Sequence, residues 1–137
     1  MDTLTTPATL DFLPEIMAFI KNTSLHHKVN AEQLMAIELA VEEVVVNIMS
    51  YAYPENSPGS VNLSCELINQ SDLIITIYDK GEAYNPLSKD EPDINADIEH
   101  RSIGGLGIFL TKEMMDDVSY QHENGKNILT LKKSLSN

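Results

Sequence analysis

Glu43 and Asn47 are the first residues whose types and spacing could support chemistry. They lie four apart within a helical apolar pattern, so both side chains fall on one face, one turn apart. The small residues Ala36, Ala40 and Ser50 share that face and leave room for a ligand. The Asn47 amide oxygen suits Mg²⁺, and the Glu43 carboxylate could act as a base toward a hydroxyl that attacks a phosphate. A solvated helix face, with Glu43 paired to a lysine, is the alternative.

Asp79 and Gly81 form a second candidate, directly after the apolar run at 73–78. A carboxylate there can accept a hydrogen bond from an exocyclic amine such as adenine N6, whereas guanine presents an acceptor at that position. Gly81 would let the base approach the backbone closely. A plain turn after a strand is the competing interpretation.

A glycine cluster formed by Gly104, Gly105, Leu106 and Gly107 is the third candidate. It is predicted to open a helix that runs through about Asp116, and the free N–H groups of a helix start can bind phosphate. The lysine and Ser/Thr of a P-loop do not follow it. A flexible loop that leads into a helix would have the same composition.

Composition narrows the class of protein. The 137 residues suffice for one domain, 1–137, and the formal net charge of −12 argues against nucleic acid or an anionic membrane as the main partner. No apolar run is long enough to span a bilayer, and no secretory signal is visible. The single cysteine, Cys65, excludes an internal disulfide. A cytoplasmic protein is expected.

The elements that must position these residues follow from periodicity and turn signals. A short edge strand at 2–8 precedes a helix capped by Thr9 that runs to about Asn22, and a linker at 22–28 follows. Asn30 and Gln33 form a capping box that starts a helix ending near Tyr53-Pro54. Strands are predicted at 61–67, at 73–78 (buried on both faces), and as a hairpin of 118–122 and 128–133 around Asn124-Gly125. This order predicts an α+β two-layer sandwich, with helices on one face of a mixed, largely antiparallel sheet.

Taken in order, these motifs resemble the Bergerat-fold ATPases, the superfamily of gyrase, histidine-kinase catalytic domains and MutL. Within it, the chain is most similar to the anti-sigma-factor serine/threonine protein kinases. The resemblance covers almost the whole chain and rests on four matched stretches: Glu43-x-x-x-Asn47 with Tyr51-Ala52-Tyr53, Asp79-Lys80-Gly81 through Tyr84-Asn85-Pro86, Ile103 to Leu110 with Met115 to Val118, and Asn124 to Leu129.

The resemblance implies a role for each matched residue. Glu43 would be the general base, Asn47 the Mg²⁺ ligand that also contacts ATP, and Asp79 with Gly81 the adenine contact. Gly105 and Gly107 would hold the phosphates, Gly104 and Leu106 would also belong to the ATP-binding residues, and residues 82–103 would form a lid over ATP. Arg101, in that lid, would contact the terminal phosphate. Because two residues separate Arg101-Ser102 from Gly105-Leu106-Gly107, a solvent-exposed arginine stays open as an alternative.

The implied activity is phosphorylation of a Ser or Thr on a STAS-type anti-sigma antagonist, with a sigma factor as a further partner and a homodimer as a common assembly. A non-catalytic module of the same fold, in which ATP orders the lid and controls partner binding, is the alternative. A detached histidine-kinase domain fits less well, because His26-His27 lacks the sequence of a phosphoacceptor helix.

Overall fold

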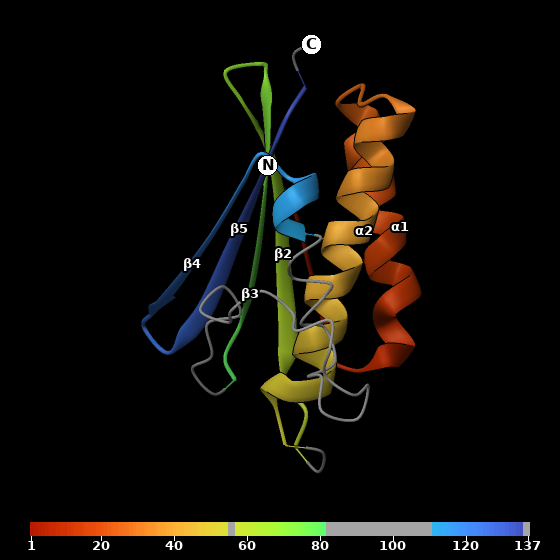
Figure 1. Cartoon of the computed structure of the whole chain (residues 1–137). Helices are drawn as coiled ribbons and strands as arrows, with labels where there is room; N and C mark the ends of the chain where they lie inside the picture. The colour runs from red at the N-terminus through yellow and green to blue at the C-terminus, as the bar shows by residue number, and fades with distance from the viewer. Residues whose placement is uncertain (55–56, 82–110, 136–137) are drawn as a thin grey trace, which may run out of the picture.

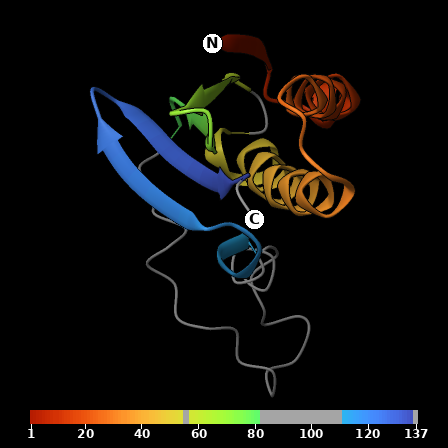
Figure 2. The same ribbon diagram turned by 90° about the horizontal axis from the view of Figure 1, so that it is seen from above.

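The described part of the chain folds into two layers, a sheet of five strands and two long helices on one of its faces (Figures 1 and 2). This computed structural model describes residues 1–54, 57–81 and 111–135. The long elements are β1 (Asp2–Pro7), α1 (Leu13–His26), α2 (Ala31–Asn47), β2 (Ser60–Ile68), β3 (Asp72–Asp79), β4 (Asp117–Glu123) and β5 (Lys126–Ser134). The predicted α+β two-layer sandwich is confirmed.

The sheet has the strand order β1-β2-β3-β5-β4, and all four of these pairings are antiparallel. The predicted edge strand at 2–8 is therefore confirmed as β1, and no parallel pairing occurs among the described strands. β3 lies between β2 and β5. Its last residue, Asp79, pairs with Val61 on one side and with Asn127 on the other.

The core lies between the helices and the covered face of the sheet. Its largest fully buried side chains are Ile16, Ile20, Ile37, Val41, Val45, Val61, Leu63, Leu73, Ile75, Ile77 and Leu131. Burial of one such side chain stabilises the fold by about 1.5–3 kcal/mol, so this layer is a rigid support for the strand ends. Cys65 lies in the same core, and burial raises the pKa of its thiol.

The prediction that the 73–78 strand is buried on both faces is wrong. Burial alternates along β3: Leu73, Ile75, Ile77 and Asp79 are buried, and Ile74, Thr76 and Tyr78 are half-buried. The two long helices lie on one face of the sheet, and an antiparallel sheet can leave its second face partly solvated. Asp79 is thereby assigned to the helix-covered face.

The first helix begins later than the Thr9 cap predicts. A 3-10 turn, η1 (Leu10–Phe12), follows Thr9, whose side chain makes no capping hydrogen bond. α1 then starts at Leu13 with Pro14 in its first turn, where the missing N–H of proline would have no helical partner in any case.

The first helix also ends later than predicted. α1 runs to His26, so both the end near Asn22 and the linker at 22–28 are wrong. The Thr23 hydroxyl donates to the carbonyl of Phe19 at 2.8 Å, which accommodates this polar residue within the helix.

The second helix begins as predicted. Asn30 Oδ1 accepts from the backbone N–H of Gln33 at 2.7 Å, and Gln33 Oε1 accepts from the backbone N–H of Asn30 at 2.8 Å, so the capping box is confirmed. After Asn47 the chain continues as a π-helix, η2 (Ile48–Ala52), and helical structure ends just before Tyr53. The α-helical spacing that placed Ser50 on the face of Asn47 does not apply within this segment.

The predicted closing hairpin is confirmed as β4 and β5. Its turn residues, Asn124 and Gly125, have φ angles of 55° and 75°, which a two-residue hairpin turn requires. Residues 111–114 are helical and lie on the same side of the sheet as α2 (Figure 2). The predicted start of this helix, at 104–107, lies outside the described residues. No helix in the described part of the chain has the length and apolar character needed to cross a bilayer.

Ser24 provides a test of the core. Its side chain is fully buried, and its hydroxyl has no hydrogen-bond partner within the described residues. Because Ser24→Ala removes an unpaired polar group, we expect it to raise the free energy of unfolding by about 1 kcal/mol in urea denaturation. Thr23→Val, which removes a hydroxyl that does have a partner, should lower it instead. A loss of stability in Ser24→Ala would contradict this account.

Candidate functional site

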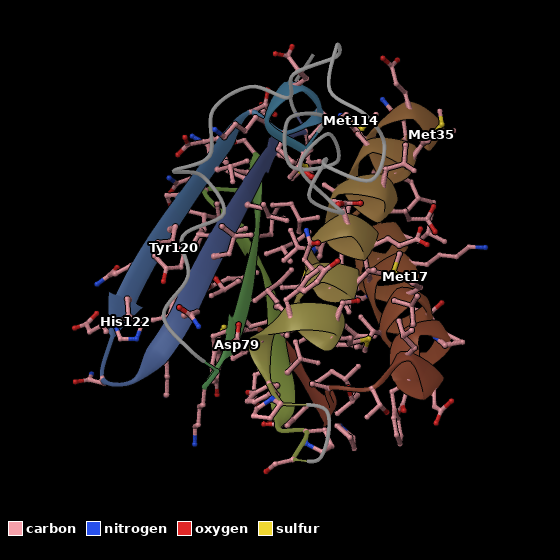
Figure 3. All side chains as sticks on the ribbon, turned by 60° about the horizontal axis from the view of Figure 1, so that its bottom comes forward. Met17, Met35, Asp79, Met114, Tyr120 and His122 are labelled. Atoms are coloured by element: carbon pink, nitrogen blue, oxygen red, sulfur yellow. The ribbon has the colours of Figure 1, made fainter. Side chains whose placement is uncertain are left out.

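Asp79 is a buried carboxylate at the end of β3, with a fractional exposure of 4%. Figure 3 shows it beside the last helical turn that follows α2. Its Oδ1 accepts two hydrogen bonds, from the backbone N–H of Gly81 at 2.8 Å and from Asn127 Nδ2 at 3.0 Å. Within the described residues no donor reaches Oδ2. A carboxylate oxygen without a donor is a position that a ligand N–H can satisfy.

Asn127 is a site residue that the sequence analysis missed. It is buried at the start of β5, and its Nδ2 also donates to the backbone carbonyl of Gly81 at 3.3 Å. Its Oδ1 accepts a hydrogen bond from the hydroxyl of Tyr120. Asn127 is in phase with the inward residues Leu129 and Leu131, so strand alternation was the signal that could have placed its amide beside Asp79.

A glycine is required at position 81 by a backbone contact with Ala52, whereas the sequence suggested a contact with a nucleobase. A Cβ built on Gly81 would lie 2.1 Å from the carbonyl oxygen of Ala52, at the end of η2. The absence of a side chain therefore lets two backbone segments touch, one after α2 and one after β3. Close approach of a nucleobase to Gly81 stays a prediction.

Tyr53 links the same two segments through its hydroxyl. It donates to the backbone carbonyl of Ser60 at 2.7 Å and accepts from the backbone N–H of Lys80 at 2.7 Å. Burial raises the pKa of this phenol above its ordinary value. Beside it lies an open pocket of about 550 Å³, lined by Tyr51, Ala52, Tyr53, Pro54, Lys80 and Gly81.

Glu43 and Asn47 contact one another, as their spacing predicts. Asn47 Nδ2 donates to Glu43 Oε1 at 3.3 Å, and both side chains are half-buried. Across the described ranges no lysine or arginine lies within ion-pair distance of Glu43, so the alternative of a lysine-paired surface glutamate has no partner among those residues. Because Glu43 holds the amino group of the amide, Asn47 Oδ1 remains available to an external ligand.

The donor set at Asn47 fits Mg²⁺ chemically. Mg²⁺ in phosphate-transfer sites takes one or two protein oxygens and completes its shell with water and phosphate oxygens. One amide oxygen on a helix meets that requirement. No group of three or more His, Cys, Asp or Glu side chains suited to a metal occurs in the part of the chain that the structure describes.

The predicted phosphate-binding residues Gly104, Gly105, Leu106 and Gly107, the predicted lid at 82–103 and its Arg101 lie outside the described residues. The helical turn at 111–114 is described, and hydrogen bonds join its C-terminal end to β5. Lys133 Nζ donates to the carbonyl of Met114 at 2.6 Å, and the backbone N–H of Asp116 donates to the carbonyl of Lys132 at 2.9 Å. This turn therefore has a fixed position relative to the strand that carries Asn127.

Gly81→Ala tests the contact between the two backbone segments. The new Cβ would meet the Ala52 carbonyl, so we expect the free energy of unfolding to fall by about 2–3 kcal/mol in urea denaturation. Gly125→Ala is the matched control. It has a positive φ of 75° but no neighbour within 4 Å, and it should cost only about 1 kcal/mol. A smaller cost at Gly81 than at Gly125 would show that the segments separate easily.

Tyr53→Phe tests the phenol bridge. At neutral pH it should lower the free energy of unfolding by about 1–2 kcal/mol, because two hydrogen bonds are lost. The pKa of Tyr53 is raised above 10.0 in the folded protein. As pH rises past 10.0, the phenol of the unfolded chain therefore loses its proton before the phenol of the folded chain does. The free energy of unfolding that Tyr53 contributes declines over this range. The difference between wild type and variant should therefore narrow above pH 10.0 in denaturation curves. A constant difference would contradict the assignment, and Tyr51→Phe, at an exposed position, is the neutral-pH control.

Comparisons with known proteins agree with this geometry. The family described as histidine kinase-like ATPase domain matches residues 6–133. The serine/threonine-protein kinase BtrW of Bordetella bronchiseptica is 26% identical over 130 residues, which are 95% of this chain and 91% of the relative. The serine-protein kinase RsbW of Staphylococcus aureus is 30% identical over 127 residues, which are 89% of this chain and 79% of the relative.

Two solved structures share the fold. The RsbU and RsbW domains of a Mycobacterium tuberculosis protein align with a TM-score of 0.67 at 15% identity, over all of this chain and 33% of that one. A blue-light activated histidine kinase domain of Erythrobacter litoralis aligns with a TM-score of 0.59 at 16% identity, over 91% of this chain and 60% of that one. This chain thus spans a third of the first structure and three fifths of the second.

The family match over residues 6–133 covers most of the 137 residues. BtrW and RsbW, which align over most of the same length, are a serine/threonine-protein kinase and a serine-protein kinase. The resemblance to the Bergerat-fold ATPases is therefore confirmed. The chain belongs to the histidine kinase-like ATPase domain family and is homologous to the RsbW and BtrW protein kinases.

Proposed function

We propose that this protein is a serine/threonine protein kinase that binds Mg-ATP and phosphorylates a Ser or Thr of a STAS-type anti-sigma antagonist. In the alternate state it would sequester a sigma factor, as expected of a partner-switching pathway. The observation that carries the proposal is the Glu43–Asn47 hydrogen bond, because it presents the amide oxygen of Asn47 and places a carboxylate beside it. The kinase relatives support the reaction class.

Asp79 would recognise the adenine of ATP. Both of its described donors reach Oδ1, which leaves Oδ2 as the acceptor for the N6 amine of the base. A guanine or hypoxanthine base presents an oxygen at that position, and two acceptors would face each other without a proton between them. The site therefore favours adenine nucleotides.

Asn47 would hold the metal, and residues 104–107 with Arg101 would hold the phosphates. When bound, Mg²⁺ neutralises charge on the phosphate oxygens during transfer. The turn at 111–114 is joined through Met114 and Asp116 to β5, the strand that carries Asn127. If a helix starts at the glycines, as the sequence predicts, its dipole and free N–H groups would favour an anion.

Glu43 would act as the general base. Its carboxylate takes the proton of the substrate hydroxyl while the hydroxyl oxygen attacks the terminal phosphorus of ATP. A bond forms between that oxygen and phosphorus, and the bond from phosphorus to the bridging oxygen of ADP breaks. The products are a phosphoserine or phosphothreonine and ADP.

A non-catalytic switch is the second candidate, and one observation favours it. Glu43 Oε1 already accepts a hydrogen bond from Asn47, so the carboxylate has a positioning role that requires no proton transfer. In that case ATP would control partner affinity and no phosphate would move.

Glu43→Gln separates these functions. A glutamine can still accept from Asn47 Nδ2 through its carbonyl oxygen but cannot take a proton. With a STAS-domain substrate and Mg-ATP, we expect the rate of phosphate transfer to fall by about 10²–10⁴-fold while the Kd for Mg-ATP changes little. Radiolabelled transfer and calorimetry measure the two quantities.

The matched control is Glu42→Gln, at an exposed position of the same helix, which should leave both the transfer rate and the Kd for Mg-ATP unchanged.

Asn47→Ala tests the metal assignment, and it should weaken ATP binding in the presence of Mg²⁺ more than in its absence. Normal transfer by Glu43→Gln would overturn the base assignment. ATP binding by the wild-type protein without transfer to any STAS-domain protein would favour the switch.

A further inference from the structure

Three polar side chains form a continuous hydrogen-bonded chain across three neighbouring strands, on the face that the helices cover. Tyr120 comes from β4, Asn127 from β5 and Asp79 from β3. Figure 3 shows Tyr120 on the outermost strand of this half of the sheet and Asp79 toward its centre. Asp79 and Asn127 are direct partners in the strand register, whereas Tyr120 is paired with Leu129 and reaches Asn127 along the diagonal. Only a long side chain spans such a diagonal.

The amide of Asn127 can take only one orientation in this chain. Its Nδ2 faces two acceptors, Asp79 Oδ1 at 3.0 Å and the carbonyl of Gly81 at 3.3 Å. Rotating the amide by half a turn would place Oδ1 against both acceptors, which is repulsive in a buried site. Asn127 Oδ1 must therefore face Tyr120, and the phenolic hydroxyl is the donor that it meets there.

This orientation determines what the carboxylate can bind. Asp79 Oδ1 receives donors from Gly81 and Asn127, so the plane of the carboxylate is held by groups from two strand ends. Asp79 Oδ2 is left as an acceptor of defined direction. We propose that Tyr120 is a positioning residue for nucleobase selection: through Asn127 it holds the Asp79 carboxylate so that the site accepts an amine and rejects an oxygen at the 6-position of a purine.

The inference rests on the proposed function, in which Asp79 meets the base. Tyr120 itself touches no nucleotide in this scheme. If Tyr120 had only a structural role, its substitution would lower the stability of the protein and weaken the binding of all nucleotides by the same factor. A positioning Tyr120 changes the ratio between two nucleotides, because only the amine-bearing base uses the aligned oxygen.

Tyr120→Phe tests the proposal with the full-length chain. Calorimetry in Mg²⁺ would give Kd values for ATP and for ITP, in which an oxygen replaces the N6 amine. We expect the wild-type protein to prefer ATP by about tenfold or more. The variant should bind ATP about three- to tenfold more weakly and bind ITP unchanged, so that the preference narrows.

Tyr78→Phe is the matched control. It removes the same hydroxyl from β3, but Tyr78 is out of phase with Asp79 and its ring lies 4.7 Å from Lys126 Nζ, a contact that a phenylalanine ring retains. Its ATP-to-ITP ratio should equal that of the wild-type protein. An unchanged ratio in Tyr120→Phe, with the wild-type preference intact, would overturn the inference and leave the proposed function standing.

A measurement without nucleotide distinguishes a failure of the positioning role of Tyr120 from a failure of the proposed contact between Asp79 and adenine. The side-chain amide protons of Asn127 should exchange slowly in the wild-type protein and about tenfold faster or more in Tyr120→Phe, as followed by NMR. Unchanged exchange would overturn the positioning role of Tyr120 whatever the protein binds. Faster exchange, together with a wild-type protein that shows no preference for ATP, would instead overturn the contact between Asp79 and adenine.

Discussion

The site depends on one steric fact, that the backbone after β3 touches the backbone after α2. Gly81 permits this contact because any side chain at that position would collide with the carbonyl of Ala52. Tyr53 then reaches both Lys80 and Ser60, so the helical layer and two strand ends are joined at the same place. Asn47 and Asp79, which belong to different layers, are thereby held in a constant relation before any ligand arrives. Preorganisation of this kind reduces the entropy lost on binding.

The polar groups of the site differ in whether the protein itself satisfies their hydrogen bonds. Buried polar groups cost free energy unless they are hydrogen-bonded. Near Asp79, the N–H of Gly81, the amide of Asn127 and the hydroxyl of Tyr120 each have a hydrogen-bond partner. Among the described residues, Asp79 Oδ2 and the amide oxygen of Asn47 remain open to a ligand. An acceptor beside a base suits an amine and an amide oxygen suits a cation, in agreement with the proposed metal-bound adenine nucleotide.

Local patterns predicted most of the fold. The capping box of Asn30 and Gln33, the turn at Asn124-Gly125 and the alternation of 61–67 each involve residues close in the sequence. The errors arose where the outcome depends on distant residues or on a compensating bond. The Thr23 hydroxyl bonds within its own helix, so α1 continued beyond Asn22, and β3 is covered on only one face. The role of Asn127 depends on its register with Asp79, and register between strands 48 residues apart is not readable from local periodicity. Of the predicted site, the structure describes Glu43 and Asn47 on α2 and Asp79 and Gly81 at the end of β3, and their roles in binding and catalysis stay predictions.

The π-helix after Asn47 has a consequence for comparing this chain with its relatives. A π-turn closes its hydrogen bonds between residues five apart instead of four, so η2 takes up about one residue more than an α-helical turn of the same rise. A relative whose helix stays α-helical would reach the residue opposite Gly81 with one residue fewer. Aligning two such sequences at constant spacing from Asn47 would pair Ala52 and Tyr53 with the wrong neighbours. In such an alignment a one-residue gap between Asn47 and Ala52 would restore the correct pairing.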